Sequence, residues 1–64
     1  MTVRDQVALD EAYKSFIGEL FKTLVRNIAA GETPHGRTPA EAFRSGAYLA
    51  IEAYQIAKDA LEKP

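Results

Sequence analysis

The residues best suited to chemistry lie in and just after one short polar segment, residues 31–38. This part of the chain carries the only histidine, His35, together with Arg37, Thr38 and Arg44. Arginine and protonated histidine side chains bind phosphates and carboxylates, and the free amides at the start of a helix also favour anions. The pattern therefore predicts a candidate binding site for a small anion or nucleotide, formed by His35, Arg37, Thr38 and Arg44.

The same segment can also be interpreted as a plain connection between two helices. Gly31 follows a long periodic stretch and is typical of a helix end, and Pro34 favours an extended residue before it. Residues 38–41, Thr-Pro-Ala-Glu, fit a capping box in which the Thr38 hydroxyl accepts from the Glu41 amide and Glu41 reaches back. Glu41 would then occupy the amides that an anion needs. The sequence leaves both interpretations open.

Two long helices must position these residues. Thr2 and Asp5 form a weaker start signal of the same kind as the one at Thr38. We therefore predict a first helix over about 3–30, a loop over 31–38 and a second helix over about 39–62. Two helices of nearly equal length on a short loop form an antiparallel hairpin, so we expect one all-α domain that spans residues 1–64.

The first predicted helix has an apolar stripe that one neighbour cannot cover. Apolar pairs recur every four residues from Ala8-Leu9 to Ile28-Ala29. Four residues turn about 400°, so the stripe moves about 40° around the helix at each repeat. The helix therefore needs more than one neighbour. Gly18, inside this helix, costs about 1 kcal/mol relative to alanine, and we expect close packing at this position by a partner subunit or a ligand.

The second predicted helix carries two apolar seams with the alternating spacing of four and three residues that is typical of helix pairs. The first seam comprises Phe43, Ala47, Ala50, Tyr54, Ala57 and Leu61. The second seam comprises Ala42, Gly46, Leu49, Ala53, Ile56 and Ala60, and its glycine and alanines allow a close helix approach.

We expect this hairpin to associate with a copy of itself. A lone hairpin of 64 residues buries too little apolar surface to offset the entropy lost on folding. The smallest closed solution is a homodimeric four-helix bundle, with higher even oligomers as the alternative.

The remaining face of the second helix is polar and exposes one aromatic residue. Tyr48 lies there with Glu52 and Gln55. An exposed tyrosine contributes much contact area at an interface, so these three residues are candidates for contact with another protein. The alternatives are that the ring packs on Arg44 or is covered by a further subunit.

No pattern indicates catalysis, a cofactor or a metal. The Glu-x-x-His pair of helical metal sites is missing, a single histidine cannot complete a zinc site within one chain, and there is no cysteine. Ser15 and Ser45 lack the sequence context of a nucleophile. We therefore expect a protein that is not an enzyme.

Composition favours a cytoplasmic protein. The net charge is −1, which drives the chain neither to nucleic acid nor to an anionic membrane. The first residues lack a signal-peptide pattern, and the longest apolar run, 46–51, is too short to span a bilayer. Charge is unevenly distributed: four basic residues exceed two acidic ones over 20–46, and seven acidic residues exceed four basic ones elsewhere. The predicted loop end is therefore positive and the opposite end negative.

Three functional classes remain. The first is a non-catalytic protein-interaction or regulatory module that works as a homo-oligomer. The second is an effector-binding protein that captures a small anion or nucleotide at the positive loop end or between subunits. The third is RNA binding, because the length and hairpin plan resemble those of small plasmid-encoded RNA-binding hairpins that dimerise into four-helix bundles. No motif is shared, and the mixed charges of the first helix are unfavourable for a phosphate backbone.

Overall fold

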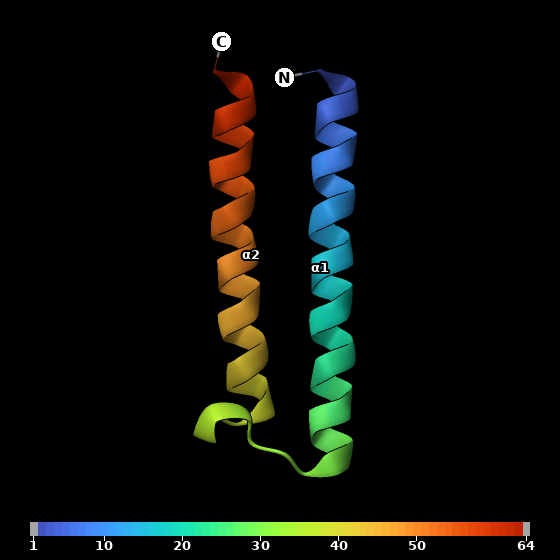
Figure 1. Ribbon diagram of the computed structural model, residues 1–64, viewed down its shortest axis with the longest axis vertical. Coiled ribbons are helices and arrows are strands. Elements are labelled where there is room, and N and C mark those ends of the chain that lie inside the picture. The colour runs from blue at the N-terminus through green and yellow to red at the C-terminus, as the bar shows by residue number, and fades with distance from the viewer. Residues whose placement is uncertain (1, 64) are drawn as a thin grey trace.

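The computed structural model describes residues 2–63 and contains two long helices joined by a short turn. Helix α1 spans Val3–Ala30, the 3-10 turn η1 spans Pro34–Gly36, and α2 spans Pro39–Glu62. The helices run antiparallel, so both ends of the chain lie at the same end of the hairpin and the loop lies at the other (Figure 1). The predicted all-helical hairpin is confirmed, since the two helices pack against each other.

Local hydrogen bonds fix where each helix begins. The Glu41 amide donates to the Thr38 hydroxyl at 3.1 Å, and the Thr38 amide donates to Glu41 Oε1 at 3.0 Å. The Asp5 amide donates to the Thr2 hydroxyl at 3.1 Å, and the return bond from the Thr2 amide to Asp5 Oδ2 is longer, at 3.4 Å. Both capping boxes predicted from the sequence are present, and the one at Thr2 is the weaker, as expected.

The loop is built from residues in the left-handed region of backbone space. Gly31 has φ 66° and closes α1, where its amide donates to the Ile28 carbonyl and the next amide donates to the Asn27 carbonyl. This pair of bonds is a Schellman motif. His35 and Gly36 follow with φ 54° and 73°. Three left-handed residues turn the chain within eight positions and direct it back along α1.

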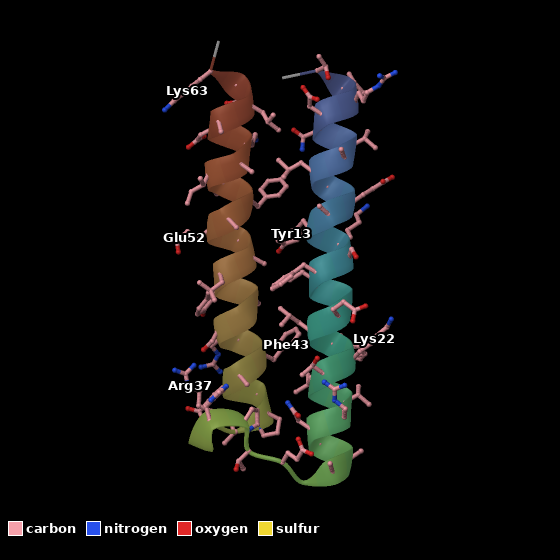
Figure 2. All side chains as sticks on the ribbon, in the orientation of Figure 1. Tyr13, Lys22, Arg37, Phe43, Glu52 and Lys63 are labelled. Carbon is pink, nitrogen blue, oxygen red and sulfur yellow. The ribbon has the colours of Figure 1, made fainter. Side chains whose placement is uncertain are left out.

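The contact between the helices is a single thin layer. Ala50 is 8% exposed and Asn27 is 5% exposed, while most other interface residues are only half-buried. Figure 2 shows Tyr13 and Phe43 pointing into the space between the helices. The Tyr13 and Tyr54 rings meet edge to face, with centroids 5.4 Å apart. The hairpin measures 47 × 17 × 11 Å, so it has little interior.

One glycine is needed for this contact and another is not. A Cβ atom built on Gly46 would lie 2.6 Å from Leu20 Cδ2, so Gly46 allows α1 to approach α2 closely. A Cβ atom on Gly18 would meet nothing within 4 Å. The close packing expected at Gly18 is therefore not made by this chain itself, and its expected contact with a second molecule stays a prediction.

Candidate functional site

The residues predicted around the loop gather beside the start of α2. Arg37 folds back along the helix, and its Nη1 donates to the Ser45 hydroxyl at 3.0 Å. Hydrogen bonds from Thr38 lower the pKa of Glu41, and the positive charges of Arg37 and Arg44 lower it further. Thr38 therefore binds the Glu41 carboxylate directly, whereas Arg37 and Arg44 act on it through their charges and, among the described residues, form no ion pair with it within 4.0 Å.

His35 occupies an exposed position on η1. Its left-handed backbone follows from the tight turn, in which the Arg37 amide donates to the Pro34 carbonyl at 3.0 Å. Of the four residues predicted to bind an anion, Thr38 is hydrogen-bonded to Glu41, and Arg37 and Arg44 affect the charge of Glu41. Within residues 2–63, His35 forms no side-chain hydrogen bond or ion pair with these residues. The Glu41 carboxylate already accepts a hydrogen bond from the Thr38 amide at the start of α2. An external anion would therefore have to displace this carboxylate or bind beside it.

The second predicted set lies on the outer side of α2. Tyr48 is 64% exposed, and Glu52 and Gln55 are exposed as well. Figure 2 shows Glu52 pointing away from α1. The alternatives, that the Tyr48 ring packs on Arg44 or is covered by a further subunit, stay predictions. These residues form an accessible surface in the single hairpin.

The two seams of α2 have different environments. The first seam faces α1: Ala50 is buried, and Phe43, Ala47, Tyr54 and Ala57 are half-buried. The second seam is half-buried only near the loop, at Ala42 and Gly46, and is otherwise exposed. Leu49 is 65% exposed and Ile56 is 62% exposed. One seam therefore holds the hairpin together, and the other is left largely open.

The open seam borders an apolar groove between the helices, which we call the groove face. The groove has a volume of about 350 Å³. Phe16 from α1 lies along it and is 47% exposed. None of the lining residues is charged: they are Leu9, Ala12, Tyr13, Phe16, Leu49, Ala50, Ala53, Tyr54 and Ala57. The second seam predicted from the sequence indicated this site, although the predicted site residues did not include it.

The other side of the helix pair, which we call the opposite face, has a second hollow whose lining includes two charged side chains. Its lining comprises Asp10, Tyr13, Lys14, Ile51, Tyr54 and Gln55. Lys14 is two positions, or about 200°, from Ala12 of the groove face, so the two hollows lie on different sides of α1. The charged side chains interrupt the apolar surface at this point.

A three-residue network ties the two helices together near the open end of the hairpin. The Tyr54 hydroxyl donates to Asp10 Oδ1 at 2.7 Å, and Gln6 Nε2 contacts the same oxygen at 2.7 Å and the Tyr54 hydroxyl at 2.8 Å. The bond from Tyr54 lowers the pKa of Asp10, and the same bond raises the pKa of Tyr54. The sequence pattern placed Tyr54 on the first seam but gave no sign of this network.

Within residues 2–63, no group of three or more acidic or histidine side chains is placed to hold a metal ion. Over the same residues, neither helix is long and apolar enough to cross a membrane. No family model, curated protein or solved structure matches the chain. The surfaces of the hairpin itself are therefore the features from which a function can be inferred.

Proposed function

We propose that this protein is a non-catalytic interaction module that works as a homodimeric four-helix bundle in the cytoplasm. The observation that carries the proposal is the large exposed surface of the single hairpin. A compact monomer of 7.0 kDa exposes roughly 4,000 Å², whereas this chain exposes 4983 Å². The excess, roughly 1,000 Å², is similar to the roughly 800 Å² that each partner buries in a standard protein interface.

The shape of the hairpin supports the same conclusion. Its radius of gyration is 14.5 Å, whereas a compact domain of 64 residues has about 11 Å. Eleven large apolar side chains are at least 42% exposed among the described residues, from Val3 to Leu61. A second hairpin would bury one broad side of this slab and double the thickness of the core.

Sedimentation equilibrium at micromolar concentration tests the proposal. The expected result is a species of about twice the monomer mass, with higher even oligomers at higher concentration. A folded monomer under these conditions would overturn the proposed function. A Tyr48→Ala variant is the matched control, because Tyr48 is exposed on the outer side of α2 and its loss should leave the dimer intact.

In the assembled module, the outer side of α2 is the surface proposed for another protein. Tyr48, Glu52 and Gln55 stay accessible there when the broad side of the hairpin is covered. A binding assay with a candidate partner should therefore depend on Tyr48, while the mass of the dimer should not.

The anion-binding alternative is supported by the positive charges of Arg37 and Arg44 near the start of α2, but the Glu41 carboxylate already accepts a hydrogen bond from the Thr38 amide there. A ligand that binds only the folded protein raises its melting temperature. Phosphate, nucleotides and carboxylates at millimolar concentration are the test. A rise that disappears in Arg37→Ala would favour this alternative. RNA binding with a steep salt dependence would favour the third class.

A further inference from the structure

We draw no further inference here: the strongest candidate, the pair of apolar surfaces on the groove face and the opposite face of the two helices, carries nothing because large apolar side chains are exposed on both, Leu49 on the one and Phe21 on the other, and nothing in the structure shows what covers either of them.

Discussion

The two seams of α2 have the same residue spacing, but only one of them is covered by α1 along most of its length. The first seam contacts α1 along most of its length, and its Ala50 is the most buried apolar residue of the described chain. The second seam is half-buried at Ala42 and Gly46, near the loop, and open beyond them. The spacing of apolar residues therefore predicts that one side of a helix will be covered. Which partner covers that side depends on how the chain is connected.

The strongest test of this comparison adds a charge to the second seam. Leu49→Glu should weaken the dimer about a thousandfold, which corresponds to about 4 kcal/mol, because a partner that covers the second seam would bury this carboxylate in each copy. Sedimentation over a range of concentrations measures the change. Tyr48→Glu is the matched control, since Tyr48 is 64% exposed and Leu49 65% in the single hairpin. Equal effects of the two substitutions would contradict burial of the second seam.

A second test uses Gly46, the glycine of the second seam, which already lies against Leu20 of α1. Gly46→Leu should destabilise the fold by about 1–3 kcal/mol, because the space beside Gly46 is filled by Leu20. Thermal unfolding at fixed protein concentration measures this loss. Gly18→Ala is the control: with nothing within 4 Å, it should gain up to about 1 kcal/mol from helix propensity. A loss at Gly18 would instead indicate that a second molecule packs closely there.

A third test changes stability without touching either seam. Thr38→Ala removes the hydroxyl that accepts from the Glu41 amide and should cost about 1 kcal/mol. For a domain of this size the melting temperature should fall by about 4–8 °C. The mass measured by sedimentation should be unchanged, because the cap lies outside both seams. A changed mass would mean that the loop takes part in the dimer contact.

The smallest expected effect concerns the network on the first seam. The pKa of Asp10 is lowered by its hydrogen bonds from Tyr54 and Gln6. The ionised carboxylate therefore stabilises the folded state above the unfolded pKa of about 4, and this contribution is lost as the pH falls through the folded value. The melting temperature of the natural protein should exceed that of Asp10→Asn at pH 7, and the gap should close near pH 2. Tyr54→Phe should show the same reduced pH dependence. A gap that stays constant with pH would contradict the assignment.

The sequence predicted the features that depend on neighbouring residues. The caps at Thr2 and Thr38 and the helix end at Gly31 each involve contacts within five positions, and all three are present in the structure. The left-handed His35 was not predicted, because the turn could have been made with Gly36 alone. Local chemistry therefore explains the boundaries of both helices.

The features that depend on the relative rotation of the helices could not be predicted in the same way. Asn27 stood in a polar gap of the pattern, yet it is 5% exposed, because the interface side of α1 moves around the helix and reaches Asn27 near the loop. Pro34 and Phe43 line the same small hollow. The contact of Gly46 with Leu20 and the Tyr54–Asp10 bond also require the pairing to be known. The groove face consists of residues that belong to the predicted apolar stripes but that this pairing of the helices leaves exposed.

The thin shape of the hairpin has a consequence for the time course of folding. Its tertiary contacts join two helices that are consecutive in the chain and separated by eight residues. Closing such a loop takes about 10–100 ns and forming a helix about 0.1–1 μs, so the hairpin can assemble in less than a millisecond. Association at typical rates of about 10⁵–10⁷ M⁻¹s⁻¹ takes about 0.1–10 s at micromolar concentration. Because the lone hairpin is not expected to be stable by itself, refolding should follow one slow phase whose rate rises in proportion to protein concentration.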